Sequence, residues 1–350
     1  MQGSQLKYLA AVTDLAALDI QSAPLTLQSE ASGRFTAFYA GAYAHGRREA
    51  EGDAKPFLLS VNAGQFKTFA AMFRDEDQIR INPTETGLSI SSANSRVHMT
   101  RNVDIREDDL NVPSANEAEF AVKLSASTLI SEVEAASAFI STSHVQPIFQ
   151  GVRLDFNEDG LRVTAYDGSS TFYQSHIKAR VKADAPGYIT LPWEDFLKGA
   201  RLIGDGTATL IKSKKEAVYI FNKTALFRTS ILVGKWPDTS KLTEQRNTTH
   251  FKVDAAQLRD LVNSAKALVS DRSIEVEENK GRVLFKTESE FGSFVTSIRG
   301  HLTAPLKYDV ESLGKVVKLG PVLDFYVPEQ AWEPTIVECD DRRCWIMTRV

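Results

Sequence analysis

The chain has 350 residues, 43% of them hydrophobic and 25% charged, so it has the composition of a globular protein rather than a disordered one. Its 41 basic and 45 acidic residues give a net charge of −4, which excludes a surface that binds nucleic acid everywhere. No apolar run approaches the roughly 18–20 residues of a membrane helix. The N-terminus lacks the pattern of a signal peptide. We therefore expect a soluble intracellular protein.

The first third of the chain predicts strands, then a helix, then strands. Alternating residues over 35–50 and 55–62 indicate strands, and the apolar spacing over 64–76 indicates a helix. Two further strands are expected within 78–103, around a Thr-Gly turn.

The middle third repeats this order. Alternating strands fill 152–182, and a helix is expected from Pro192 to about residue 203, because proline is tolerated at the first turn of a helix. Strands resume between 208 and 232. Another helix, over 127–141, carries Glu132 and Glu134 and no basic residue.

The last third begins with a helix predicted over 253–270, followed by strands between 274 and 302. A short helix is expected around 320–328, and then a closing hairpin that holds Cys339 and Cys344. Two cysteines without a nearby histidine do not make a zinc site. Reduced thiols are the expected state, with a cross-strand disulfide as the alternative.

The repetition predicts three α+β domains of about 115 residues each, because self-similarity at a fixed period indicates a repeated structural unit. Their boundaries are expected in two polar, turn-rich stretches, 111–119 and 240–249. The predicted domains are therefore 1–115, with a shortened N-terminus, 116–243 and 244–350.

Basic residues recur opposite the apolar positions of three predicted helices. In the last helix the apolar positions are Leu258, Leu261, Val262, Ala265, Leu268 and Val269. The candidate DNA-binding residues are Lys67, Arg74, Lys198, Arg201, Lys252, Arg259 and Lys266. Phosphate contacts of this kind carry no sequence information. The alternative is that these side chains are simply solvated.

Motifs of common catalytic sites are missing from the sequence. It has no phosphate-binding GxxxxGK[ST] loop, no GxSxG nucleophile elbow and no HExxH metal site. Acidic pairs such as Asp340 and Asp341 lie in predicted turns, where carboxylates are usually solvated. We therefore expect no catalytic residue, metal or cofactor, and a protein that is not an enzyme.

Several segments of the middle third resemble one family. They are Pro147, Gly151-Val152, Leu161 and Tyr166-Asp167-Gly168, followed by GYITLPWEDFLKGARLI and by GKWPD at 234–238. These segments resemble the middle domain of the bacterial DNA polymerase III beta subunit, the sliding clamp. The likeness is specific over about 120–240, extends over 245–350 and is weak in the first 30 residues. The departures are typical of a divergent member, such as a phage-encoded one.

The resemblance implies three similar domains per chain, with antiparallel sheets outside and helices inside. Two chains would meet head to tail in a closed ring around double-stranded DNA, with the basic helices facing the duplex. In the family, the contact between chains involves positions that match Val97 and Met99 on one side and Leu268 and Val269 on the other. The alternative is that Leu268 and Val269 belong to the core of their own domain.

The resemblance also implies a pocket that binds short peptides of a polymerase and a clamp loader. The matching positions are Phe149, Tyr166, Gly168, Ser169, Ser170, Thr171, Pro237, Leu242, Cys344 and Ile346. This chain has Ser169-Ser170-Thr171 where the family often has His-Arg-Leu, and Tyr166 replaces a smaller residue. These departures predict either a narrower pocket or one that recognises a different motif.

The function expected from this resemblance is a cytoplasmic processivity factor that encircles DNA and tethers a replicative polymerase. Two alternatives remain open on the sequence. One is a hydrolase with an unrecognised carboxylate pair, and the other is a β-rich structural or interaction protein of a phage particle.

Overall fold

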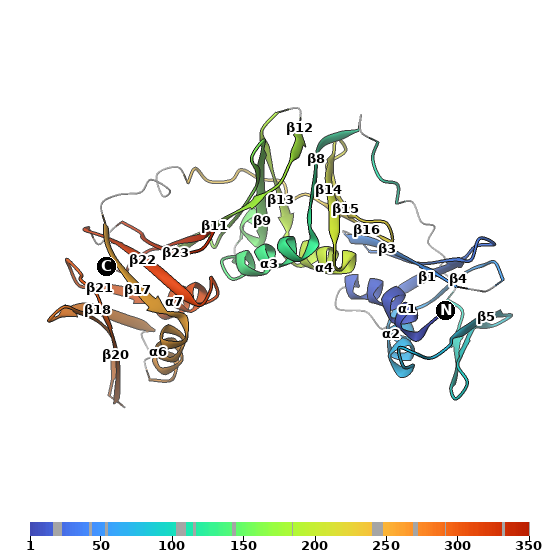
Figure 1. Cartoon of the computed structure of the whole chain (residues 1–350), viewed down its shortest axis with the longest axis horizontal. Helices are drawn as coiled ribbons and strands as arrows, with labels where there is room; N and C mark the ends of the chain where they lie inside the picture. The colour runs from blue at the N-terminus through green and yellow to red at the C-terminus, as the bar shows by residue number, and fades with distance from the viewer. Residues whose placement is uncertain are drawn as a thin grey trace. The chain divides into compact units, whose positions relative to one another are not determined.

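The computed structural model describes residues 1–16, 23–41, 44–52, 55–102, 110–114, 117–141, 145–183, 185–239, 248–268, 272–290, 292–330 and 333–349. It is an α+β protein of antiparallel sheets, as predicted (Figure 1). The chain forms two compact units. Unit 1 holds 1–130, 179–186 and 191–231, and unit 2 holds 131–178, 187–190 and 232–350.

Unit 1 contains a nine-stranded sheet of order β12-β8-β14-β15-β16-β3-β2-β1-β4. The strands in chain order are β1 (Pro24–Ser29), β2 (Arg34–Ala40), β3 (Ala44–Glu51), β4 (Phe57–Asn62), β8 (Ala118–Ser125), β12 (Val181–Ala183), β14 (Thr207–Ser213), β15 (Ala217–Phe221) and β16 (Ala225–Ser230). A separate three-stranded sheet is formed by β5 (Arg80–Thr84), β6 (Gly87–Ser91) and β7 (Arg96–Thr100).

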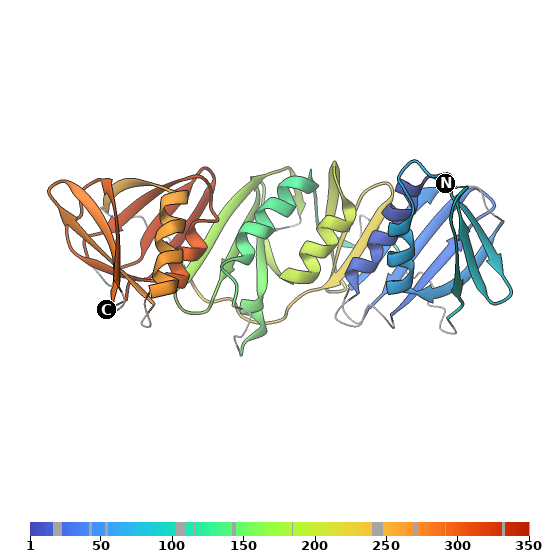
Figure 2. The ribbon, with the colours of Figure 1, turned by 90° about the horizontal axis from the view of Figure 1, so that it is seen from below.

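Short helices accompany the sheets of unit 1. They are α1 (Gly3–Ala10), the 3-10 helix η1 (Ala11–Leu15), α2 (Ala63–Met72) and α4 (Trp193–Ile203). Figure 2 shows α1 and α2 lying side by side. The side chain of Asn62 accepts the backbone N–H of Gln65, which caps the N-terminus of α2. The first domain, predicted with a shortened N-terminus, begins with the eight-residue helix α1.

Arg48 of β3 is a buried charged residue of unit 1, with an exposed fraction of 6%. Its guanidinium donates hydrogen bonds to the carbonyl oxygens of Leu202, through Nε at 2.7 Å, and of Tyr8, through Nη1 at 2.8 Å. It also lies 4.1 Å from the centre of the Tyr8 ring. The last carbonyl oxygens of a helix have no hydrogen-bond partner within the helix. Arg48 supplies a donor to one of them at the end of α4, and so connects α4 to β3 and α1.

Unit 2 contains an eight-stranded sheet of order β13-β9-β10-β11-β24-β23-β22-β17. The strands in chain order are β9 (Gly151–Asn157), β10 (Gly160–Tyr166), β11 (Thr171–Lys178), β13 (Gly187–Pro192), β17 (Thr248–Asp254), β22 (Val322–Pro328), β23 (Thr335–Cys339) and β24 (Arg342–Ile346). A four-stranded sheet of order β20-β19-β18-β21 consists of β18 (Ser273–Asn279), β19 (Arg282–Ser289), β20 (Gly292–Arg299) and β21 (Leu306–Asp309).

The helices of unit 2 include α6 (Ala255–Leu268) and α7 (Val310–Val316), which pack against each other (Figure 2). A 3-10 helix, η2 (Pro147–Gln150), precedes β9, and α3 (Ala126–Ser137) has most of its residues in this unit. Leu258, Leu261, Val262 and Ala265 of α6 are buried, which confirms the apolar face predicted for this helix.

Each large sheet combines strands from two of the three predicted domains. In unit 1, β16 pairs with β3 from Ala225↔Arg48 to Thr229↔Ala44. In unit 2, β11 pairs with β24 from Thr171↔Ile346 to Ser175↔Arg342. The predicted middle domain thus contributes strands to both units. The predicted boundaries at 115/116 and 243/244 lie outside the described residues and remain predictions.

The short helix predicted around 320–328 is wrong, because these residues form β22. Buried Leu323, Phe325 and Val327 alternate with more exposed residues, which is the period of a strand, and β22 pairs with β17. The short helix of this region is α7, which begins after Asp309. The Asp309 side chain accepts the backbone N–H groups of Glu311 and Ser312.

The closing hairpin is β23–β24, as predicted. Cys339 and Cys344 are both free and buried, so the expectation of reduced thiols is confirmed. Burial raises the pKa of the Cys344 thiol. Within the described ranges, none of the helices has the length and apolar character needed to span a membrane.

Candidate DNA and peptide interfaces

The clearest basic face lies on α6. Arg259 and Lys266 are exposed, opposite the buried residues of the same helix. The Nζ atom of Lys266 lies 3.1 Å from a carboxylate oxygen of Glu311 on α7. A phosphate group must therefore compete with this carboxylate for Lys266, whereas the exposed Arg259 forms no ion pair with any residue in the described part of the chain.

Lys252 does not lie on α6, and its assignment to the helical stripe is wrong. It belongs to β17, where buried Phe251 and Val253 alternate with exposed Lys252 and Asp254. Asp254 accepts the backbone N–H of Ala256 at 2.7 Å and so starts the helix at Ala255. Lys252 forms an ion pair with Asp324 of β22, with a shortest distance of 3.1 Å between nitrogen and oxygen.

In unit 1 the basic candidates lie on or near α2 and α4. Lys67 of α2 forms an ion pair with Asp14 of η1. Arg74 lies beyond the end of α2 at Met72, so its placement on the same helical stripe is wrong. On α4, Arg201 is exposed and Lys198 is partly exposed. Burial raises the pKa of Asp195, and the nearby Lys198 opposes this shift.

The acidic helix α3 has a structural explanation. Glu132 accepts hydrogen bonds from the hydroxyl of Tyr173 at 2.8 Å and from the guanidinium of Arg342, with Nη2 at 2.8 Å. Burial is the largest influence on the pKa of Glu132 and would raise it. The hydrogen bonds from Arg342, Ser175 and Tyr173, together with the charge of Arg342, outweigh burial, so the pKa lies below its usual value. Glu132 therefore fixes α3 to β11 and β24, which explains an acidic residue on this helix without any role in DNA binding.

One face of the eight-stranded sheet carries a continuous row of aromatic rings. In the order of their contacts the rings are Trp236, Phe149, Tyr166, Phe172 and Trp345, with centroid separations of 6.2, 5.4, 6.2 and 5.1 Å. We call this set the aromatic row. Tyr166 is its central ring and contacts the two apolar clusters at its ends. Such ring pairs stabilise a core beyond the area that they bury.

The predicted pocket residues are distributed over both faces of this sheet. Phe149 and Tyr166 belong to the aromatic row and contact each other. Thr171 pairs with Ile346, and Tyr173 pairs with Cys344. These four residues lie on the opposite face from Phe172, because neighbouring residues of a strand point to opposite faces. Cys344 and Ile346 are fully buried, so they have no surface to offer a peptide in this structure.

The remaining predicted pocket positions are more accessible. Gly168 has φ +85°, in the left-handed region that favours glycine, and Ser169 beside it is exposed. Pro237 is partly exposed and follows the buried Trp236. Leu242 lies outside the described residues.

Three exposed apolar side chains of unit 2 lie close to members of the aromatic row, either along the chain or through Arg153, and the sequence analysis did not identify them. Val145 and Val233 are 94% and 83% exposed, and Tyr188 is 45% exposed. The Arg153 guanidinium lies 4.0 Å from the ring centre of Tyr188 and 5.6 Å from that of Trp236. Trp236 lies in the GKWPD segment already singled out, but exposure of the three other side chains has no signature in the sequence.

The predicted subunit contact is only partly visible. Met99 of β7 is buried and Val97 is partly exposed, so Val97 is the more accessible of the two. Leu268 is the last residue of α6, but its side chain, like the whole of Val269, lies outside the described residues. The choice between a subunit contact and the core of their own domain therefore remains open for these two residues.

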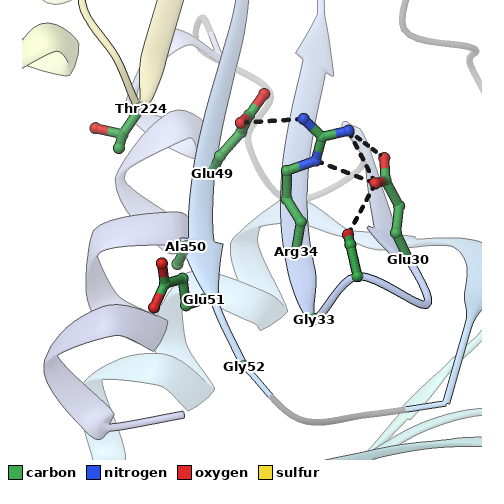
Figure 3. A pocket seen from close by; sticks show the side chains of 9 residues that line it. Glu30, Gly33, Arg34, Glu49, Ala50, Glu51, Gly52 and Thr224 are labelled. Atoms are coloured by element: carbon green, nitrogen blue, oxygen red, sulfur yellow. Dashed lines mark hydrogen bonds and ion pairs between the residues drawn. The ribbon is translucent and has the colours of Figure 1, made fainter.

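A hollow of about 830 Å³ in unit 1 was not expected from the sequence. Figure 3 shows Arg34 at its centre, between Glu30 and Glu49. Arg34 Nη2 donates to a Glu30 oxygen at 2.7 Å, and Arg34 Nη1 lies 3.8 Å from Glu49. These charges satisfy one another, so we assign this hollow no ligand.

Solved structures share the fold along the whole chain, although the sequence matches no protein-family model and no curated protein. A sliding clamp (DNA polymerase III subunit beta) from Pseudomonas aeruginosa, bound to griselimycin, has a TM-score of 0.84 at 17% identity. The DNA polymerase III beta subunit from Thermotoga maritima has a TM-score of 0.84 at 13% identity. Both comparisons cover 100% of this chain and 98% of the other.

A third structure is that of a beta clamp from Helicobacter pylori bound to a DNA ligase peptide. Its TM-score is 0.79 at 14% identity, and the comparison covers 99% of this chain and 97% of the other. These likenesses confirm the predicted fold.

Proposed function

We propose that this chain, which has the fold of the bacterial DNA polymerase III beta subunit, is a DNA sliding clamp that makes a polymerase processive. The observation that carries the proposal is the fold likeness to clamps over the full length of both chains. Fold alone does not assign function, but the basic face of α6 and the apolar surface around the aromatic row add two surfaces that a clamp needs.

The proposed function is encirclement of DNA and involves no catalysis. Two chains meet head to tail in a ring, with Val97 and Met99 near one half of the contact and the end of α6 near the other. The ring works where DNA is replicated, in the cytoplasm, which is the host cytoplasm for a phage-encoded chain. Loading onto closed DNA requires a separate clamp loader.

The DNA contacts in this proposal are weak and electrostatic. Arg259 and Arg201 are exposed on α6 and α4. Lys67 and Lys266 form ion pairs with Asp14 and Glu311. Phosphate contacts through such side chains are independent of sequence and weaken with salt. A net charge of −4 is consistent with a protein held on DNA by its topology rather than by adhesion.

In this proposal the tethering surface includes Phe149 and Tyr166, which contact each other, together with the exposed apolar side chains of Val145, Val233 and Tyr188. Short segments of a polymerase and a clamp loader bind there. Two clamps of the same fold have been solved with a DNA ligase peptide and with griselimycin, which supports a peptide site in this chain. Tethering raises the local concentration of the polymerase at the primer end.

The proposal is tested by threading the protein onto linear duplex DNA with biotin at both ends and then blocking the ends with streptavidin. A ring should stay on blocked DNA in high salt and leave unblocked DNA, because salt weakens phosphate contacts but not topological linkage. Equal loss from both DNAs would contradict encirclement.

A charge-reversed variant tests the basic face of α6. Arg259→Glu with Lys266→Glu should shorten retention on blocked DNA without unfolding the chain. The matched control is Lys280→Glu with Arg299→Glu, two exposed residues of the four-stranded-sheet region in the same unit. An unchanged lifetime in the first double variant would overturn the assignment of this face to DNA.

A further inference from the structure

The loop between β10 and β11 is organised around one carboxylate. Oδ1 of Asp167 accepts the backbone N–H groups of Ser169, Ser170 and Thr171 at 2.9, 2.8 and 3.0 Å. Oδ2 accepts the hydroxyls of Ser170 at 3.0 Å and Thr171 at 2.6 Å. The loop is thus folded around the side chain of Asp167, and the left-handed Gly168 completes the turn.

A lysine from a distant part of the chain closes this network. The Nζ atom of Lys315 on α7 donates to Oδ2 of Asp167 at 2.7 Å and to the hydroxyl of Thr171 at 2.9 Å. The hydroxyls of Ser170 and Ser312 lie 3.4 Å apart, which adds a second contact between the loop and α7. The loop is therefore attached to a helix that lies about 150 residues later in the chain. No local sequence signal could have predicted this contact.

The ion pair is largely removed from solvent, with side-chain exposures of 8% for Asp167 and 23% for Lys315. Burial would raise the pKa of Asp167, but the bonds from Lys315 and Thr171 outweigh it and hold the pKa far below its usual value. Asp167 is therefore ionised at neutral pH, and its charge is matched by Lys315.

The loop also forms part of the proposed peptide site. Tyr166 immediately precedes it and is the central ring of the aromatic row, while Ser169 is exposed at its tip. The backbone N–H of Met347, just after β24, donates to the carbonyl of Ser170 at 2.9 Å. Any shift of the loop relative to α7 therefore moves groups that a bound peptide would meet.

We infer that Lys315 is a positioning residue that fixes the 166–171 wall of the peptide site against α7, so that the wall is formed before a partner binds. This inference rests on the proposed function. A preformed site loses less conformational entropy on binding than a mobile one. Lys315 also decides the chemistry of the wall, because it neutralises Asp167 and leaves serine hydroxyls at the surface. The fitting partner is a peptide with an apolar anchor and an uncharged neighbour.

The test uses the full chain, with Lys315→Met as the variant and Lys318→Met as the matched control. Lys318 lies just after α7 and is exposed. Griselimycin, which one clamp of this fold binds, serves as the probe in titration calorimetry. Amide exchange over residues 168–171 is measured in parallel, since a general loss of stability would speed exchange elsewhere as well.

The expected result is faster exchange confined to 168–171 and an affinity for griselimycin reduced about fivefold or more in Lys315→Met, with a less favourable binding entropy. Lys318→Met should match the wild type in both measurements. If Lys315→Met does not fold, Lys315→Gln removes the charge but keeps a donor and should show the same changes in weaker form.

Three results would overturn the inference: unchanged affinity in the variant, unchanged exchange over 168–171, or no binding of griselimycin by the wild type. Retention on end-blocked DNA separates these failures from failure of the clamp function. Lys315→Met should be retained as long as the wild type, because the peptide site takes no part in encirclement.

Discussion

Strands of different predicted domains pair at two places, which we call seams. The two seams differ in how the charged side chains beside them are paired. In unit 1 the seam is β16–β3, and in unit 2 it is β11–β24. Both are antiparallel ladders within a continuous sheet. At the first seam, the Arg48 guanidinium donates to carbonyl oxygens at the end of α4. At the second seam, the basic side chains form ion pairs with carboxylates, Arg342 with Glu132 and Lys315 with Asp167.

The difference shows where the structure leaves room for binding. At the first seam, the Arg48 guanidinium binds backbone carbonyl oxygens and is covered by the Tyr8 ring, so its charge is not available to a ligand. The β11–β24 seam instead ends in the loop at Asp167 and in Phe172 and Trp345 of the aromatic row, with Ser169 of the loop exposed. The first seam is structural, and the second carries the proposed peptide site.

Removal of Arg48 should have the largest effect on stability. Arg48→Met leaves buried carbonyls at the end of α4 without a partner, so we expect unit 1 to lose about 3 kcal/mol in urea unfolding. The control Arg96→Met changes an exposed residue at the start of β7 and should cost less than about 0.5 kcal/mol. Equal losses would show that the first seam does not depend on Arg48.

Breaking the Glu132–Arg342 ion pair of the second seam should cost somewhat less stability than removal of Arg48, because these two side chains are not fully buried. Arg342→Met leaves the Glu132 carboxylate without its cation, and we expect unit 2 to lose about 2 kcal/mol in the same measurement. Its neighbour Arg343 points to the other face and pairs with Glu338 near the surface, so Arg343→Met should cost under about 1 kcal/mol. The account fails if Arg343 proves the more important of the two.

Acid should distinguish the Asp167–Lys315 pair from its surroundings. The pKa of Asp167 is lower in the folded chain than its usual value of 3.8, so the pair stabilises the fold fully above that pH. This stabilisation is lost as the pH falls below 3.8 towards the folded value. The stability difference between wild type and Lys315→Met should therefore be constant near neutral pH and shrink in acid. A difference that does not change with pH would contradict the ionised pair.

The smallest expected effect concerns DNA binding. Glu311→Gln releases Lys266 from its ion pair, so duplex affinity should rise a few-fold at low salt. The slope of log affinity against log salt should steepen by up to about 0.9, the value for one added phosphate contact. Glu275→Gln, an exposed change on β18, is the control. If the salt slope of Glu311→Gln equals that of the wild type, Lys266 does not contact DNA.

Much of the fold follows from local patterns in the sequence. The period of α6 is clear in its buried leucines and valine, and the resemblance around Asp167-Gly168 indicates the clamp fold. The local pattern also contained signals that were misread. Alternation over 322–328 marks a strand, and alternation around Lys252 marks β17 rather than an early turn of α6.

The site was harder to predict, because its parts are brought together by pairing distant in sequence. Nothing near Lys315 indicates that it contacts Asp167, and nothing near Glu132 indicates Arg342, about 210 residues away. The face on which Cys344 and Ile346 lie depends on the register of β24 against β11, which a one-residue shift would reverse. Such facts require the tertiary structure.

The central claim is that two chains form a ring around DNA, and small-angle X-ray scattering of the purified protein over a concentration series tests it most directly. We predict a mass from forward intensity equal to two chains, and a distance distribution with the depletion at short range that a hollow ring produces. A single compact chain at every concentration would contradict encirclement.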